Sequence, residues 1–266
     1  MNEAALTSAD RPHRIAVTGT AGAIGQIVGR ALLKRGHFVR GFDCRTGPLL
    51  SESVVGNLVD APAVAQCVAT VDTVIHLAAT PDVHDFATNL APNNIIGTYH
   101  LLEACLAAGV GRVVLASTFR VVGGNMPDGA FATAATPTAP RDYYALTKVC
   151  VEQMGAMAAA RGLQVIAARL GWLPRNTGEA QTMAQSPRRR ALYLSHQECR
   201  DFFIRAVERP WPDQTVNPFE IVYVFSGDPA CQYDATPAYG LLGYRGHDVF
   251  PHGLDFAFPP SADPAV

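Results

Sequence analysis

A tyrosine and a lysine four residues apart form the pair in this sequence that is best suited to move a proton. Tyr144 and Lys148 stand in the stretch RDYYALTK, and this spacing places both side chains on one face of a helix. A phenol with a pKa of ~10 is a poor base at neutral pH, but an adjacent ammonium favours the phenolate. Lowering that pKa by ~3 units takes about 4 kcal/mol of preferential stabilisation of the anion. The pair therefore predicts a tyrosine that exchanges a proton, although the same spacing also occurs in surface pairs.

Three glycines near the N-terminus form a second candidate site. Gly19, Gly22 and Gly25 lie between an apolar run, residues 15–17, and a helix expected to begin near Ile24. Glycines in this layout let the chain turn tightly and let a pyrophosphate approach the free N–H groups at the positive end of the helix. An empty strand-to-helix turn could carry the same glycines, so the sequence around them has to decide between the two interpretations.

The next apolar segment favours nucleotide binding. HFVRGFD ends in Asp43, 18 residues past Gly25, close to the spacing at which an acid accepts hydrogen bonds from an adenosine ribose. A carboxylate there repels a 2′-phosphate, which favours NAD over NADP. Arg45 would soften that preference if it faced the ribose, and otherwise is a solvated loop charge.

Two hydroxyl residues end a buried run further along the chain. Ser117 and Thr118 follow VVLA, and in doubly wound sheets ligands collect at the carboxyl ends of strands. We expect both hydroxyls to face the cofactor cleft, with helix or turn capping as the alternative.

The elements around these residues alternate between short apolar strands and longer helical patterns, which predicts an α/β fold, a Rossmann doubly wound parallel sheet. The expected strands are Arg14 to Thr18, Phe38 to Phe42, Thr73 to Leu77, Arg112 to Ala116 and Gln164 to Arg169, and the expected helices are Ile24 to Lys34, Asn94 to Ala108 and Tyr144 to Ala160.

The chain changes character after Gly171, where an arginine run, a helical stretch near residues 197–207 and an apolar strand at Glu220 to Phe225 follow. We predict a Rossmann domain over residues 12–171 and a small C-terminal substrate cap, interleaved with the sheet, over 172–258. Residues 1–11 and 259–266 are expected to be flexible ends.

Composition narrows the class of protein. The 266 residues are 48% hydrophobic with a formal net charge of −2, so the sequence offers no basic footprint for nucleic acid. It holds no apolar run of the ~20 residues that a membrane helix needs, and its start is unlike a signal peptide, which predicts a cytoplasmic protein. The six cysteines lack zinc-ligand spacing, so no metal is expected.

The ordered set of motifs resembles the extended short-chain dehydrogenase/reductases, the NAD-dependent epimerase/dehydratase family. The set comprises the glycine turn, Asp43, HLAA from His76, NIIGTYHLLEA from Asn94, Ser117-Thr118 and YALTK, over roughly residues 15–171. The resemblance implies NAD as cofactor, Tyr144 as the acid/base, Lys148 as its polarising partner and Thr118 as a hydrogen-bond partner of the reacting oxygen. Asn57-Leu58 stands where the family usually has an Asp-Leu that contacts adenine. The cofactor-binding residues implied are Gly19, Gly22, Ala23, Ile24, Gly25, Asp43, Asn57, Leu58, Leu77, Ala78, Ala79, Asn94, Tyr144 and Lys148.

Within that family the chain is most similar to the hexuronate dehydrogenases. The similar features are its short C-terminal part, its Leu-Ser-His segment at 194–196 and GLLGY at 240–244. It departs from them at Phe119 and Arg120, where they have Asn-His, and at Trp172, where they have a small hydroxyl residue. Their carboxylate-binding arginine stands seven residues before the serine of the Ser-His pair, a position that Arg188 occupies here. Arg120, beside the hydroxyl residues, is a second candidate for an anionic group of the substrate, and the alternative for Arg188 is a solvated charge run. Thr118, Phe119, Arg120, Trp172 and Arg188 are the substrate-binding candidates.

The resemblance implies an NAD-dependent dehydrogenase that moves a hydride between nicotinamide and a carbinol carbon of a small polar substrate, such as a sugar or sugar acid. The alternatives are an epimerase or dehydratase that retains NAD, and a non-catalytic dinucleotide-binding protein. Members of the family commonly pair through two helices, which here are Asn94 to Ala108 and Tyr144 to Ala160. We therefore expect a homodimer.

Overall fold

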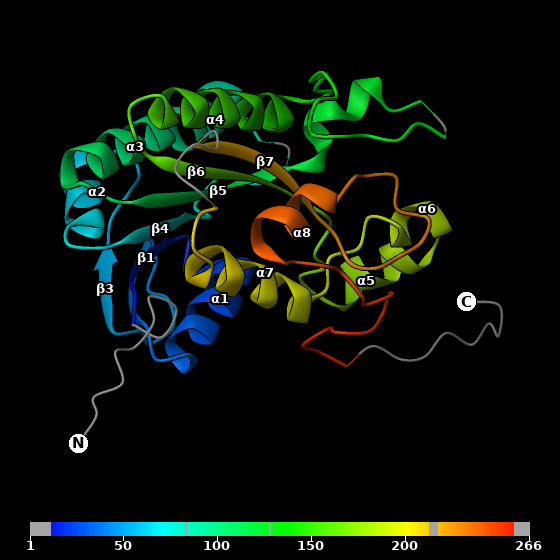
Figure 1. Cartoon of the computed structure of the whole chain (residues 1–266), viewed down its shortest axis with the longest axis horizontal. Helices are drawn as coiled ribbons and strands as arrows, with labels where there is room; N and C mark the ends of the chain where they lie inside the picture. The colour runs from blue at the N-terminus through cyan, green and yellow to red at the C-terminus, as the bar shows by residue number, and fades with distance from the viewer. Residues whose placement is uncertain (1–11, 83, 128, 213–217, 258–266) are drawn as a thin grey trace.

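The computed structural model describes residues 12–82, 84–127, 129–212 and 218–257. Its centre is a parallel seven-stranded sheet of order β3-β2-β1-β4-β5-β6-β7 (Figure 1), so the predicted doubly wound α/β fold is confirmed. The strands are β1 (Arg14–Thr18), β2 (Phe38–Asp43), β3 (Glu52–Val55), β4 (Thr73–His76), β5 (Arg112–Thr118), β6 (Gln164–Leu170) and β7 (Phe219–Val224).

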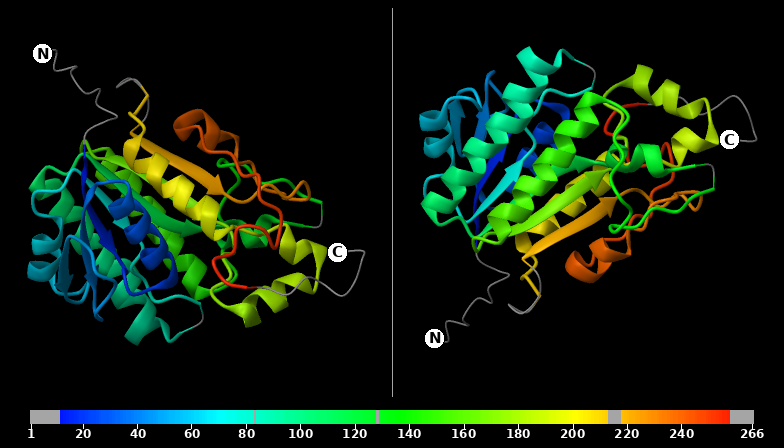
Figure 2. Two further views of the ribbon diagram at one scale, coloured as in Figure 1. Left: turned by 90° about the horizontal axis from the view of Figure 1, so that it is seen from below. Right: turned by 90° about the horizontal axis from the view of Figure 1, so that it is seen from above.

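Helices cover both faces of the sheet because successive strand residues point to opposite sides. In β1, Ile15 and Val17 pack into one core cluster and Ala16 into the other. One face carries α1 (Ala23–Lys34) and α7 (His196–Glu208), and the other carries α2 (Ala61–Val68), α3 (Gly97–Ala108) and α4 (Tyr143–Ala159) (Figures 1 and 2).

The predicted strands 38–42, 73–77, 112–116 and 164–169 exist as β2, β4, β5 and β6, each with a C-terminal end that differs by one or two residues. Other differences concern β3 and β7. β3 was not predicted, because Val54 is its one buried residue and so its sequence has no alternating apolar pattern. The predicted strand at 220–225 exists as β7, one residue earlier, and it extends the sheet by pairing with β6.

The expected helix from Asn94 starts instead as a wide π-helical segment, η2 (Phe86–Ile96), which contains Pro92 and leads directly into α3.

The remaining segments gather beyond the carboxyl ends of the strands. They include the short helices η3 (Phe119–Asn125), α5 (Thr177–Ala184) and α6 (Pro187–Arg190), while α8 (Thr236–Leu242) packs near β7 and α7 (Figure 2). Met183, Tyr193 and Phe250 form a small core of their own against Trp172. The division at residue 171 stays a prediction, and the expected flexible ends lie outside the described residues.

Within the described part of the chain, no helix combines the length and the apolar character needed to cross a membrane.

Candidate active site

The predicted proton-transfer residues meet in one cleft at the carboxyl edge of the sheet. Thr118, Tyr144 and Lys148 line a cavity of about 690 Å³ together with the glycine turn and Trp172. Ligands bind at this edge in open α/β sheets because the loops after adjacent strands diverge there. The structure therefore brings residues from the start, middle and end of the predicted Rossmann region together.

Local structure fixes the orientation of the tyrosine and the lysine. Asp142 caps α4, and its Oδ1 accepts a hydrogen bond from the Ala145 amide at 2.8 Å, so the helix begins at Tyr143. One turn later the buried Lys148 Nζ donates to the Ala116 carbonyl in β5 at 2.9 Å. The Lys148 ammonium lies 5.8 Å from the centre of the Tyr144 ring.

Burial opposes the charged forms of both groups. It raises the pKa of the Tyr144 phenol to about 12 and lowers the pKa of Lys148 to about 8. Positive charge near the ring therefore favours the phenolate. Among the described residues the guanidinium of Arg120, which lies 5.2 Å from the ring centre, lowers the pKa of the phenol most, and Arg175 lowers it less.

The two hydroxyls after VVLA have different surroundings. Both line the cleft, but the Ser117 hydroxyl donates to the buried Glu152 carboxylate at 2.6 Å, and that carboxylate also binds Arg169. Among the described residues, the partner of Thr118 Oγ1 is the Arg120 amide, which donates a long hydrogen bond of 3.3 Å. Thr118 is therefore better placed to contact a ligand.

The glycine turn fits a dinucleotide because it has no room for side chains. Gly19 has a φ of +78°, and a Cβ there would come within 2.7 Å of the Ala78 amide nitrogen. A Cβ at Gly25 would overlap the Gly19 carbonyl and come within 2.8 Å of the Thr20 Cα. The backbone is thus packed against the end of β4 and opens directly into α1, whose N-terminus has no side-chain cap. A tight glycine turn next to the free N–H groups of a helix N-terminus is the arrangement that binds phosphate groups.

A second cavity of about 260 Å³ continues the cleft from the glycine turn toward β2 and β3. The Asp43 carboxylate is held there by the amides of Ala21, at 2.9 Å, and Arg45, at 3.0 Å. The predicted cofactor residues that line one or both cavities are Gly19, Gly22, Ala23, Ile24, Gly25, Asp43, Asn57, Leu58, Leu77, Ala78, Ala79, Tyr144 and Lys148.

Asn94 is the predicted cofactor residue that lines neither cavity. It is 1% exposed, and its side chain accepts from the Thr80 amide at 2.8 Å and donates to Thr147 at 3.0 Å. It joins the loop after β4 to α4 behind the cleft wall. Asn94 therefore holds the wall of the cleft in place.

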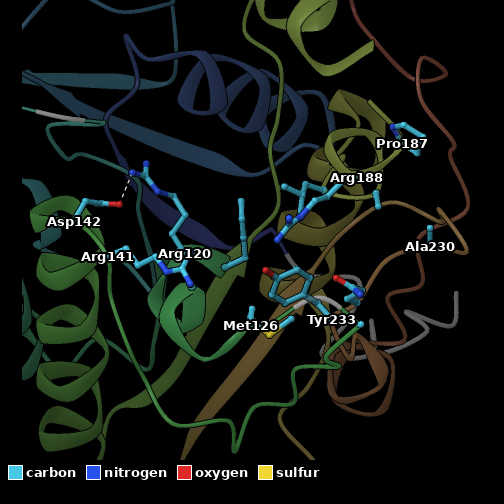
Figure 3. A pocket seen from close by; sticks show the side chains of 14 residues that line it. Arg120, Met126, Arg141, Asp142, Pro187, Arg188, Ala230 and Tyr233 are labelled. Carbon is cyan, nitrogen blue, oxygen red and sulfur yellow. Dashed lines mark hydrogen bonds and ion pairs between the residues drawn. The ribbon is translucent and has the colours of Figure 1, made fainter. Parts of the chain in front are cut away.

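A side pocket of about 390 Å³ adjoins the cleft (Figure 3). Phe119 and Arg120 line both spaces, and Arg188 and Tyr233 line the side pocket. The structure thus brings together Arg120 and Arg188, which the sequence named separately. The arginine run is not uniform, because Arg189 and Arg190 instead bind carbonyl groups of α5, at Thr182 and Ala184.

Sequence reasoning missed several residues of this region. Arg141 and Tyr233 line the side pocket, and Arg175 and Asp82 face the cleft as an ion pair of 3.1 Å. Arg141 begins the stretch RDYYALTK, in which only the Tyr-Lys spacing pointed to a role. Tyr233, Arg175 and Asp82 belong to loops without a recognisable motif, so only the positions of the strand ends could have suggested them. Among the residues described, no group of His, Cys, Asp or Glu could hold a metal ion.

Comparison with known proteins supports the family resemblance that the motifs indicated. The model of the "NAD dependent epimerase/dehydratase family" matches residues 15–191. L-arabinose 1-dehydrogenase (NAD(P)(+)) of Haloferax volcanii is 33% identical over 253 residues, which cover 88% of this chain and 96% of the relative. Uronate dehydrogenase of Pseudomonas putida is 27% identical over 260 residues, 94% of this chain and 91% of the relative.

Solved structures agree with these relatives. Uronate dehydrogenase from Agrobacterium tumefaciens, in a mutant form complexed with NAD, superposes with a TM-score of 0.77 at 25% identity, covering 90% of this chain and 86% of that one. Glucuronic acid dehydrogenase from Chromohalobacter salexigens gives a TM-score of 0.77 at 26% identity, with coverage of 90% and 86%. Together with the cleft, these matches confirm the predicted resemblance: the chain belongs to the NAD-dependent epimerase/dehydratase family.

Proposed function

We propose that this protein is an NAD-dependent dehydrogenase that oxidises a hydroxyl-bearing carbon of a sugar or sugar acid. The observation that carries the proposal is the convergence of Thr118, Tyr144 and Lys148 in a cleft that continues to the glycine turn. The two relatives named above are called dehydrogenases of a sugar and of a sugar acid, and each aligns with almost its full length.

In this reaction Tyr144 accepts the proton of the substrate hydroxyl, and Thr118 orients that hydroxyl by a hydrogen bond. Lys148 stabilises the phenolate, while its hydrogen bond to Ala116 holds the ammonium in place. Bound NAD supplies the hydride acceptor. The glycine turn holds its pyrophosphate, and Asp43 holds the adenosine ribose. Phe119 and Trp172 form apolar walls of the substrate pocket.

The experiment that tests the proposal is to incubate the purified protein with NAD and a panel of aldoses and hexuronates, and to follow NADH absorbance. Stoichiometric NADH supports a dehydrogenase. Conversion of sugar without NADH supports the alternative, an epimerase or dehydratase that retains its cofactor. If NAD binds and no sugar is converted, the non-catalytic alternative is favoured.

The position of Asp43 predicts a preference for NAD over NADP. We expect at least about tenfold tighter binding of NAD, because the carboxylate at the end of β2 repels a 2′-phosphate. Asp43→Asn keeps an acceptor for one of the two amides, of Ala21 or of Arg45, and removes the charge, so it should bring the two affinities within about threefold. Calorimetric titration of both cofactors measures this, and equal wild-type affinities would contradict the prediction.

The side pocket predicts that Arg188 binds an anionic group of the substrate. A guanidinium binds a carboxylate through two charge-assisted hydrogen bonds. Arg188→Ala should therefore raise KM for a hexuronate about tenfold and leave KM for a neutral aldose nearly unchanged. Arg189→Ala is the matched control, since Arg189 is bonded to Thr182 and Gln185 within its own segment. If Arg188→Ala keeps the wild-type preference between the two sugars, the anion site lies elsewhere.

We also propose that the protein is a cytoplasmic homodimer, paired through the outer surfaces of α3 and α4. Ile96, Tyr99, Leu146 and Met157 are between 36% and 69% exposed on or beside these helices. Met157→Glu should convert a species of about twice 28.3 kDa into the monomer in sedimentation experiments. Leu49→Glu is the control, because Leu49 is 94% exposed and lies outside these helices. A wild-type monomer at micromolar concentration would contradict the proposal.

A further inference from the structure

One carboxylate connects Arg120 to the helix that carries Tyr144. Asp142 Oδ2 accepts a hydrogen bond from Arg120 at 2.6 Å (Figure 3), while its Oδ1 caps the first turn of α4. The Arg120 guanidinium lies 5.2 Å from the centre of the Tyr144 ring, within the range of a cation–π contact. Because Arg120 stands two residues after Thr118, the contact also joins the end of β5 to the start of α4.

In this arrangement the Arg120 guanidinium is already paired and is not free to bind a substrate anion. Its side chain is 32% exposed and already has a carboxylate partner. A substrate carboxylate would have to compete with Asp142 for the same guanidinium. The geometry instead directs the charge of Arg120 toward the phenol ring.

The other charged groups around Tyr144 do not supply the same effect. Lys148 faces it from α4, with its ammonium bonded to Ala116. Asp142 at the cap raises the pKa of the phenol, but by less than its partner Arg120 lowers it. Asp82 from the loop after β4 also raises this pKa, and its ion-pair partner Arg175, from the loop after β6, lowers it by less. Burial raises the pKa of the phenol, and Arg120 is the strongest charge acting to lower it.

We propose that Arg120 is a positioning residue for Tyr144: held by Asp142, its guanidinium lies against the phenol ring, fixes the ring in the cleft and stabilises the phenolate. This inference rests on the proposed function, in which Tyr144 accepts the substrate proton. It also gives Arg120, which follows Ser117 and Thr118 in the sequence, a role that needs no contact with the substrate.

The test is the pH dependence of kcat in the direction of sugar oxidation. Tyr144 acts as a base, so kcat rises with pH through the apparent pKa of the phenol. Arg120→Gln removes the stabilising charge, and should move this rise to higher pH by about one unit. Below the rise kcat should fall about tenfold, and above it the two proteins should converge. Arg120→Lys keeps the positive charge and should recover most of the shift.

Arg245→Gln is the control for net charge. Arg245 is exposed, lies over the ring of Tyr239 and is not among the residues that line the cleft or the side pocket, so its removal changes the net charge equally at a distance from the site. It should leave the pH of the rise unchanged. An equal shift in Arg245→Gln would show that net charge, and not the contact with Tyr144, sets the pKa of the phenol, and would overturn the proposal.

A second readout needs no substrate. The tyrosinate absorbance of Tyr144 is obtained by subtracting the titration of the Tyr144→Phe protein from that of its parent, with and without Arg120→Gln. A shift to higher pH in the Arg120→Gln pair supports the proposal even if no sugar is oxidised, in which case the proposed function fails and the contact stands. An unshifted titration overturns the proposal. So does a rise in KM for acidic sugars with no change in the pH of the rise, because Arg120 would then bind the substrate.

Discussion

Tyr144→Phe is expected to lower kcat about a thousandfold, while NAD affinity stays within about threefold of wild type. Phenylalanine keeps the ring and its packing in the cleft but removes the oxygen that accepts the proton. The glycine turn and Asp43, which we propose to hold the other parts of the cofactor, are untouched by the change. Steady-state kinetics and calorimetric NAD titration measure the two quantities.

Tyr143→Phe is the matched control for this prediction. Tyr143 is adjacent in the sequence but 63% exposed, and its ring packs against Phe86 at 5.1 Å. The change should alter kcat less than about threefold, as expected for a surface substitution. Comparable losses in the two variants would show that the pairing with Lys148 has been misassigned.

Gly25→Ala should weaken NAD binding at least about a hundredfold. The added Cβ would overlap the Gly19 carbonyl and press on the Gly19 carbonyl carbon at 2.7 Å, and both partners are backbone atoms that cannot rotate away. The turn must therefore move from the position that leaves room for a pyrophosphate. The same overlap should lower the free energy of unfolding by about 2 kcal/mol. Calorimetry and chemical denaturation measure the two effects.

Two other glycines separate the local clash from a general effect of alanine. A Cβ at Gly22 would meet the Gly19 carbonyl at 3.2 Å, so Gly22→Ala should weaken NAD binding less than Gly25→Ala. Gly123 has open space where its Cβ would lie, and Gly123→Ala should bind NAD as wild type does. If Gly25→Ala retains wild-type affinity, the turn does not bind the cofactor as proposed.

The sequence by itself determined the fold class and the central pair of the site. Strand runs such as 14–18 and 112–116 are recognisable because a strand buried on both faces is continuously apolar. The glycines and the Tyr144–Lys148 spacing are local patterns too, since a turn or a helix fixes the relative positions of residues a few places apart. β3 was not predicted because an exposed edge strand has little apolar sequence of its own.

Tertiary structure alone decided which side chains meet around that pair. Arg120 and Asp142 are 22 residues apart, and Arg175 and Asp82 are 93 apart, yet each pair forms a close contact. Ser117 and Thr118 are neighbours with the same type of side chain, but the strand directs one hydroxyl to Glu152 and leaves the other available to a ligand. Of the three consecutive arginines in α6, Arg188 lines the side pocket. Such choices depend on how distant strand ends and helices pack, and no local spacing encodes a contact between segments whose relative position is set by the core between them.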